Sequence, residues 1–285
     1  MEDERLLQAE GFRVLRSLGQ GEYGRVYLIY NASIGVLTAK IINQDNFNNE
    51  GWKIIGDILK GGQNPFLIQY FGGKKIDSAG VFIVLMEFAN AGNLCNIIDQ
   101  QKDLPSAIVR AMFKQLLEGL RVINSNNLVH KNLKSQNILM HSPSGSGRVF
   151  LKISDYGLLK MKKQISLSSS ALINGFFPNF APELVFGDGK VDAKADVWSI
   201  GIIFFQILTH ELPFQVQTLA ELQTQMRKKK IIRPAAIKND NLWSLISNLL
   251  AFDKKDRISA LDALKHPYFT GEQAIKDIQE NIRNL

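Results

Sequence analysis

The feature that most constrains the fold is a glycine cluster between two stretches of alternating apolar and polar residues, FRVLRSLGQGEYGRVYLIY at positions 12–30. Such alternation on both sides of glycines predicts two paired strands. The cluster comprises Gly19, Gly21, Gly24 and Val26 in the pattern GxGxxGxV. Glycines without a Cβ let a hairpin backbone lie close over phosphate groups. Dinucleotide-binding folds share GxGxxG but continue into a helix, whereas a strand follows here, which argues against that fold.

Further strands and a break in the chain follow this hairpin. An apolar strand is expected at 35–42 and carries Lys40, which comes 21 residues after Gly19. A turn at 77–80 leads into a second apolar strand, VFIVLMEF, which ends at Phe88. The sequence Asn-Ala-Gly at 90–92 then breaks the strand and begins a different region.

That second region begins with a helix and a polar loop. An apolar stripe at helical spacing predicts a buried helix over 105–124. The stripe comprises Ile108, Met112, Leu116 and Leu120, with Val109, Phe113 and Leu117 beside them. The loop VHKNLKSQN follows at 129–137, then ISDYG at 153–157 and APE at 181–183.

These motifs, in this order and spacing, resemble the protein kinase family of the serine/threonine type over 12–269. The resemblance implies an α+β fold of two lobes with a nucleotide between them. A small antiparallel β lobe is expected over 12–88 and a larger, mainly helical lobe over 89–269. Residues 270–285 are expected to form a C-terminal helical tail.

The resemblance also assigns roles to individual residues. ATP would be bound by Gly19, Gly21, Gly24, Val26 and Lys40 and by backbone groups of Glu87 and Ala89. Mg²⁺ would be held by Asn137 and Asp155, and Lys134 would contact the phosphate that is transferred. Asp196 would hold the catalytic-loop backbone, and Arg257 would pair with Glu183.

Four departures from the family pattern bear on activity. Asn132 stands where the family has its catalytic aspartate. Ile55 stands at the position of the helix glutamate that pairs with the phosphate-binding lysine, and Glu50 is about 140° away around the helix. Phe176 replaces a threonine, and Lys131 replaces an arginine, which makes a poorer fork for a phosphate.

Asparagine can accept a hydrogen bond but cannot take a proton. Because losing a general base costs about 10² to 10⁴ in rate, the leading hypothesis is a pseudokinase that binds ATP and Mg²⁺ and acts as a scaffold or allosteric partner of another protein. The alternative is an active but slow serine/threonine protein kinase with a protein substrate. A third hypothesis, a fold that binds no nucleotide, requires Thr38 and Ile55 to have reshaped the pocket.

Composition limits the remaining possibilities. The net charge is +7, and its densest run, at 227–230, is interpreted as a solvated helix end. No pattern favours nucleic-acid binding, and no apolar stretch is long enough to cross a membrane. One cysteine and an acidic N-terminus favour a soluble, intracellular, cytoplasmic protein. Four serines, Ser166, Ser168, Ser169 and Ser170, are candidates for phosphorylation on composition alone.

Overall fold

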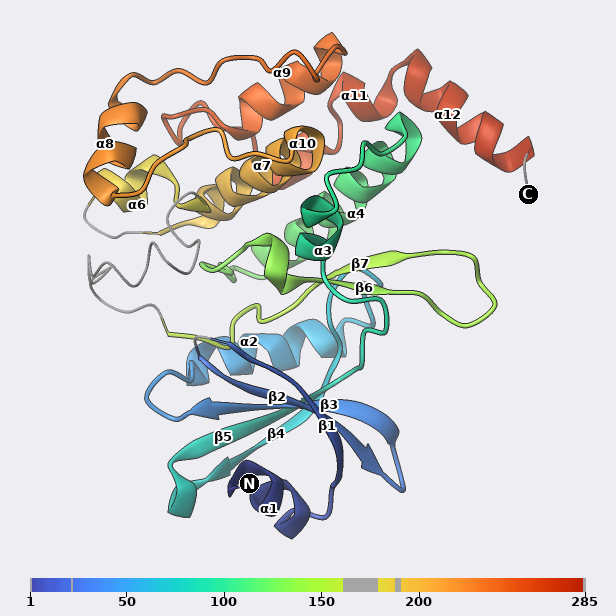
Figure 1. The fold of residues 1–285 in the computed structure, drawn as a ribbon, viewed down its shortest axis with the longest axis vertical. Coiled ribbons are helices and arrows are strands. Elements are labelled where there is room, and N and C mark those ends of the chain that lie inside the picture. Colours follow the sequence, from blue (N-terminus) through green and yellow to red (C-terminus); the bar gives the residue numbers. More distant parts are fainter. Residues whose placement is uncertain (1, 22, 161–178, 188–190, 284–285) are drawn as a thin grey trace.

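The computed structural model describes residues 2–21, 23–160, 179–187 and 191–283, with side chains up to Asp277 in the last helix. The described chain forms a small lobe, mainly of strands, and a larger lobe, mainly of helices (Figure 1). The predicted two-lobed α+β fold is therefore confirmed.

The small lobe is built on a five-stranded antiparallel sheet with the order β1-β2-β3-β5-β4. Its strands are β1 (Arg13–Gly21), β2 (Gly24–Asn31), β3 (Gly35–Asn43), β4 (Tyr70–Ile76) and β5 (Val81–Met86). The glycine cluster forms the turn between β1 and β2, as the alternating pattern predicts, and Gly21 pairs with Gly24 across it. A short turn of 3₁₀ helix, η1 (Asp77–Ala79), joins β4 to β5 at the predicted turn.

Two helices cover opposite faces of this sheet. Side chains alternate along strands, so Tyr27 and Ile29 of β2 face one side, where they pack with Leu7 of helix α1 (Glu2–Ala9). On the other side Phe82 and Val84 of β5 belong to the main core, which includes the buried residues of helix α2 (Asn49–Lys60). The sequence patterns did not predict α1.

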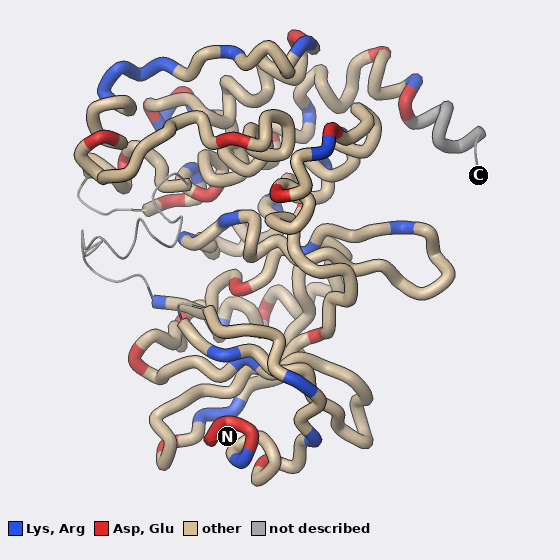
Figure 2. The backbone as a smooth tube through the Cα atoms, viewed as in Figure 1, with Lys and Arg blue, Asp and Glu red and all other residues tan. Residues whose placement is uncertain are grey.

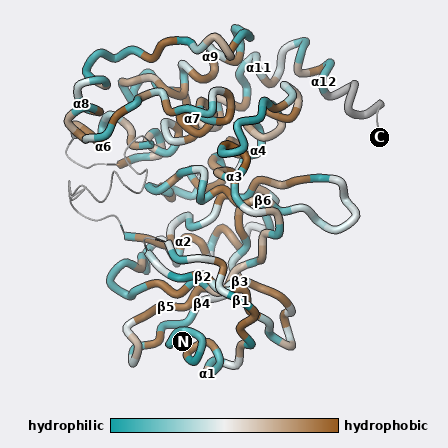
Figure 3. Tube along the Cα trace, viewed as in Figure 1, coloured by the Kyte–Doolittle hydropathy of each residue, from teal (hydrophilic) through white to brown (hydrophobic). Residues whose placement is uncertain are grey.

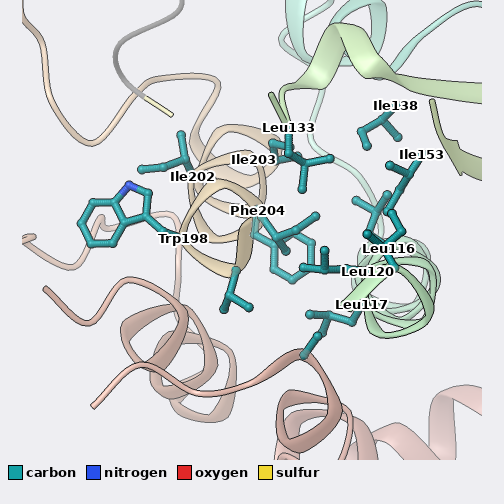
Figure 4. Close-up of a cluster of buried hydrophobic side chains, with 14 of the residues drawn as sticks. Leu116, Leu117, Leu120, Leu133, Ile138, Ile153, Trp198, Ile202, Ile203 and Phe204 are labelled. Carbon is teal, nitrogen blue, oxygen red and sulfur yellow. The ribbon is translucent and has the colours of Figure 1, made fainter. Parts of the chain in front are cut away.

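The large lobe is centred on two long helices, α4 (Ser106–Ser125) and α7 (Ala193–Thr209). Leu116, Leu117 and Leu120 of α4 gather beside Phe204 of α7 (Figure 4). The rings of Phe113 and Phe204 stack with centroids 3.4 Å apart. Helix α7 is apolar on nearly every side, as expected for a helix surrounded by other elements (Figure 3). The prediction was wrong for Ile108, which is 48% exposed because it lies on the outer side of α4.

Shorter elements complete this lobe. Strands β6 (Ile138–His141) and β7 (Phe150–Ile153) form an antiparallel hairpin, and a glycine- and serine-rich segment at 142–149 joins them. The remaining elements are α3 (Leu94–Asp99), η2 (Ser135–Asn137), α6 (Pro182–Phe186), α8 (Leu219–Arg227), α9 (Asp240–Leu249), α10 (Ala260–Ala263), α11 (Pro267–Thr270) and α12 (Glu272–Arg283).

A buried ion pair anchors the last helix to the lobe. Arg110 of α4 donates from Nε to Asp277 Oδ2 at 2.9 Å, and its guanidinium lies 4.3 Å from the ring centre of Tyr268. Both charged side chains are less than a tenth exposed. The first turns of α12 therefore pack on α4, while Figure 1 shows the helix extending away from the lobe. In the described part of the chain, no helix is long and apolar enough to cross a membrane.

The docking of α1 depends on one carboxylate. Asp3 accepts a hydrogen bond from the buried Tyr27 hydroxyl at 2.8 Å and another from Arg25 Nη2 at 2.6 Å. We predict that Asp3→Ala lowers the free energy of unfolding by about 1 to 3 kcal/mol, because the Tyr27 hydroxyl loses its partner. Urea unfolding measures this, with Glu2→Ala, an exposed acid one residue away on α1, as the matched control. Equal stabilities of the two variants would contradict the assigned role of Asp3.

Candidate functional site

A cavity of about 510 Å³ lies between the two lobes. Its walls come from the β1–β2 turn, from β3, from the connection after β5 and from the loops around β6 and β7. The structure brings the predicted site residues together here, with one exception. Those lining the cavity are Gly19, Gly21, Val26, Lys40, Glu87, Ala89, Asn132, Lys134, Asn137 and Asp155.

The exception is Gly24, which is not among the residues that line the cavity. A Cβ added to Gly24 would lie 2.1 Å from the carbonyl oxygen of Ile41 on β3. Glycine is therefore needed at this position because β2 and β3 approach each other closely. Gly19 differs, because its φ of +148° favours glycine although a Cβ there would meet open space.

Lys40 and Asp155 form an ion pair across the cavity. Lys40 Nζ lies 2.6 Å from Asp155 Oδ2, and the two side chains are only 9% and 11% exposed. Ile55 of α2 is fully buried, as its apolar side chain requires, whereas Glu50 lies exposed on the same helix. The lysine–glutamate pair expected of an active kinase is thus absent from the described residues, and Lys40 pairs with Asp155 in its place.

Two glycines hold the segment after Asp155 against α2. Asp155 has a φ of +64° and Gly157 a φ of +72°, so the backbone turns sharply between strand β7 and the next segment. A Cβ on Gly51 of α2 would lie 2.1 Å from the Gly157 carbonyl oxygen. Tyr156, between Asp155 and Gly157 in the sequence, is buried. Its hydroxyl donates a hydrogen bond to the Ile68 carbonyl oxygen at 2.7 Å. Burial raises the pKa of that hydroxyl above its usual range, so it remains a donor at neutral pH.

The buried carboxylate of Asp196 holds the backbone of the loop at 129–137. Asp196 accepts hydrogen bonds from the backbone N–H groups of His130 at 2.8 Å and Lys131 at 2.9 Å, as predicted. Complete burial raises the pKa of the Asp196 carboxyl, although these N–H donors favour its ionised form. The ring of His130 lies 2.8 Å from the Ser154 carbonyl oxygen and so ties the loop to the segment that carries Asp155.

Asn132 and Asn137 are linked within this loop. The Asn137 side chain donates from Nδ2 to the backbone carbonyl oxygen of Asn132 at 2.8 Å. The structure gives the side chain of Asn132 no hydrogen-bond partner among the described residues. Its amide therefore stands at the cavity wall, half-buried and able to accept a hydrogen bond.

The connection between the lobes is held by a side-chain pair that sequence reasoning missed. Glu87 accepts from Lys152 Nζ and from the Gln69 N–H, each at 2.8 Å. The Glu87 N–H donates to the Gln69 carbonyl at 2.9 Å, so of its backbone groups only the carbonyl is left for a ligand. The signal in the sequence was Lys152 itself, a charge inside the apolar run FLKI.

Glu183 of helix α6 pairs with Arg257 and so anchors the segment that follows residues 161–178. Arg257 donates from Nη1 and Nη2 to the two carboxylate oxygens of Glu183, at 2.7 and 3.0 Å, and it is fully buried. Two parallel charge-assisted bonds fix geometry as well as adding energy. The predicted pair is confirmed. The candidate serines at 166–170 and Phe176 lie outside the described residues.

The oxygens at the cavity are suited to a cation that arrives with phosphates. No group of three or more His, Cys, Asp or Glu side chains that could hold a metal occurs among the described residues. Asp155 and Asn137 supply one carboxylate and one carboxamide to the same cavity. Mg²⁺ is commonly held by one or two carboxylates together with substrate phosphates and water. The pair therefore fits a magnesium ion bound with a nucleotide.

A family model for the protein kinase domain matches residues 12–269. This chain belongs to the protein kinase family. The match covers both lobes and the complete cavity, and it includes the anchoring pairs around Asp196 and Arg257. Protein kinases use ATP and Mg²⁺ in general.

Curated relatives agree with this assignment. The chain is 29% identical to serine/threonine-protein kinase ULK3 of Homo sapiens over 270 residues, which are 91% of this chain and 55% of the relative. It is 27% identical to the probable serine/threonine-protein kinase nek3 of Dictyostelium discoideum over 90% of this chain and 23% of the relative. It is 32% identical to serine/threonine-protein kinase unc-51 of Caenorhabditis elegans over 66% of this chain and 22% of the relative. The chain thus spans about half the length of the ULK3 relatives it matches.

The basic run at 227–230 lies away from this cavity. Figure 2 shows it as a run of blue at the end of α8, at the edge of the large lobe farthest from the small lobe. All four side chains are exposed, which confirms the interpretation of a solvated helix end.

The close contact between Gly51 and Gly157 gives a test of how Asp155 is positioned. We predict that Gly51→Ala destabilises the fold by about 1 to 3 kcal/mol, because the added methyl must push α2 away from Gly157. Gly56→Ala, on the same helix with open space around it, should instead stabilise by about 0.5 to 1 kcal/mol. Thermal unfolding of both variants measures this difference, and changes of the same sign would contradict the contact.

Proposed function

We propose that this protein is a pseudokinase: it binds ATP with Mg²⁺, transfers phosphate poorly, and acts chiefly as a scaffold or allosteric partner of another protein. Asn132 carries the proposal. It lines the cavity beside Lys134 at the position of the family's catalytic aspartate, and its carboxamide has no basic group with which to take a proton from a hydroxyl. Orientation of a substrate could persist, since the amide oxygen still accepts a hydrogen bond.

Ile55 supports the same conclusion from the other lobe. Active protein kinases need both the lysine–glutamate pair and the metal-binding aspartate in place. Here the glutamate position holds a fully buried isoleucine, and the lysine is bonded to the metal-binding aspartate itself. Two carboxylates used in the family's chemistry are therefore replaced, and losing the general base alone costs about 10² to 10⁴ in rate.

The second candidate is an active but slow serine/threonine protein kinase that modifies a protein substrate. Lys40, Lys134, Asn137 and Asp155 favour it, because they line one cavity as phosphate transfer requires. The relatives favour it as well, since their names describe serine/threonine-protein kinases.

Further proposals follow from the sequence. The lobes would divide at 88/89 within a kinase domain of 12–269, with a helical tail at 270–285. A single cysteine fits a reducing, cytoplasmic location. A protein is the expected partner or substrate, with no nucleic acid or membrane involved.

Transfer of labelled γ-phosphate from Mg-ATP to a generic basic protein decides between the two candidates. With Asp155→Ala as the blank, we predict transfer near the blank for the natural chain. Asn132→Asp restores a base and should raise the rate by about 10² or more. The exposed Asn241→Asp on α9 is the matched control and should change nothing.

Transfer well above the blank by the natural chain would refute the pseudokinase proposal and establish the slow kinase. An Asn132→Asp rate equal to that of the natural chain would refute the role given to Asn132, because it would show that the general base is not what limits transfer.

Nucleotide binding is tested separately by thermal unfolding. Saturating Mg-ATP should raise the melting temperature, since a ligand at 100 times its Kd stabilises by about 2.7 kcal/mol. Lys40→Met should remove most of the shift, whereas Lys53→Met, an exposed lysine on α2, should keep it. No shift in the natural chain would favour the third hypothesis, in which Thr38 and Ile55 have closed the pocket to nucleotide.

A further inference from the structure

Among the described residues, no carboxylate of helix α2 pairs with Lys40. The Lys40 side chain is 9% exposed, and its ammonium group bonds to Asp155 at 2.6 Å. The acids of α2 do not face it: Glu50 is exposed, and Asp57 is exposed and bonds to Lys60 at 2.9 Å. Asp155 is the only carboxylate that the described structure gives Lys40.

The side chain of Ile55 faces this region. A Cβ added to Gly157, two residues after Asp155, would lie 3.2 Å from Ile55 Cδ1. An apolar side chain therefore occupies the space beside the segment that carries Asp155. A poorly hydrated charge without a partner is costly, so Lys40 is held to the one partner it has.

A magnesium ion at Asp155 would have to share that carboxylate with Lys40. Two positive centres on one carboxylate repel each other, and more strongly at a partly buried site than in water. With a glutamate at position 55, the lysine could turn to that side chain and release Asp155 to the metal. Here no such alternative partner is described.

Lys40 can also serve the phosphates directly. An ammonium group has three donors, so Lys40 can keep its bond to Asp155 and still donate to phosphate oxygens. The charged residues lining the cavity are Arg16, Lys40, Lys134, Glu87 and Asp155. Glu87 is paired with Lys152, and Arg16 adds a positive charge to the Lys40–Asp155 pair without any metal.

We propose that the affinity of the cleft for ATP depends little on the Mg²⁺ that accompanies the nucleotide, because Lys40 already pairs with Asp155 and Ile55 leaves Lys40 no other partner. The inference rests on the proposed nucleotide binding and adds how the metal contributes to it. Regulation would then follow the ATP concentration and depend little on that of free Mg²⁺.

Calorimetric titration of the full chain with ATP, in excess Mg²⁺ and in EDTA, tests this. For the natural chain the two dissociation constants should differ by less than about tenfold, or 1.4 kcal/mol. Ile55→Glu gives Lys40 a second carboxylate and should make binding more than about tenfold weaker in EDTA than in Mg²⁺. Ile55→Gln is the control of similar size without charge and should behave as the natural chain does.

The outcomes separate the two proposals. Binding in Mg²⁺ that weakens more than tenfold in EDTA would overturn the inference and leave the proposed nucleotide binding intact. Absence of binding in both buffers would overturn both. Equal behaviour of folded Ile55→Glu and Ile55→Gln would overturn the role given to position 55. If Ile55→Glu does not fold, the comparison of the natural chain in the two buffers still decides.

Discussion

The ion pair between Lys40 and Asp155 is the contact on which the candidate site depends. It joins β3 of the small lobe to the segment that follows β7 of the large lobe, and both partners are about nine-tenths buried. A pair so poorly hydrated tolerates the loss of one partner badly. The segment that carries Asp155 is in turn held by the contact of Gly157 with Gly51 and by the hydroxyl of Tyr156 on Ile68. The position of α2 and the state of the cleft are therefore linked through a few short contacts.

The large lobe keeps the side-chain interactions that hold its loops in position, although Asn132 replaces the family's catalytic aspartate in one of them. Asp196 still receives two backbone N–H groups from the loop that contains Asn132, and Arg257 still grips Glu183 with two bonds. These interactions fix backbone position and take no part in proton transfer. Their presence agrees with the proposed role as a scaffold or allosteric partner.

Much of the fold could be predicted because its signals are local. The strands around the glycine turn, the helix at 106–125 and the anchoring role of Asp196 follow from periodicity and motif spacing. What failed depends on contacts between distant segments. Docking of α1 through Asp3, the pairing of Arg110 with Asp277 and the exposure of Ile108 are set by which faces meet in three dimensions. Gly24 matched a phosphate-binding pattern, yet its spacing cannot reveal that a neighbouring carbonyl on β3 leaves no room for a Cβ.

The partner of Lys40 could not be predicted from the sequence for the same reason, because it depends on a contact between distant segments. The alignment of Ile55 with a missing glutamate predicts that a pair is lost, but only the geometry gives Asp155 as the replacement. Loss of carboxylates at positions 55 and 132 has two opposite consequences for a kinase cleft. Under the proposed function, it removes a base and a lysine partner and so would lower the rate of phosphate transfer, while a cavity left more positive would favour a polyphosphate. Both consequences agree with the proposal of a cleft that holds a nucleotide better than it consumes one.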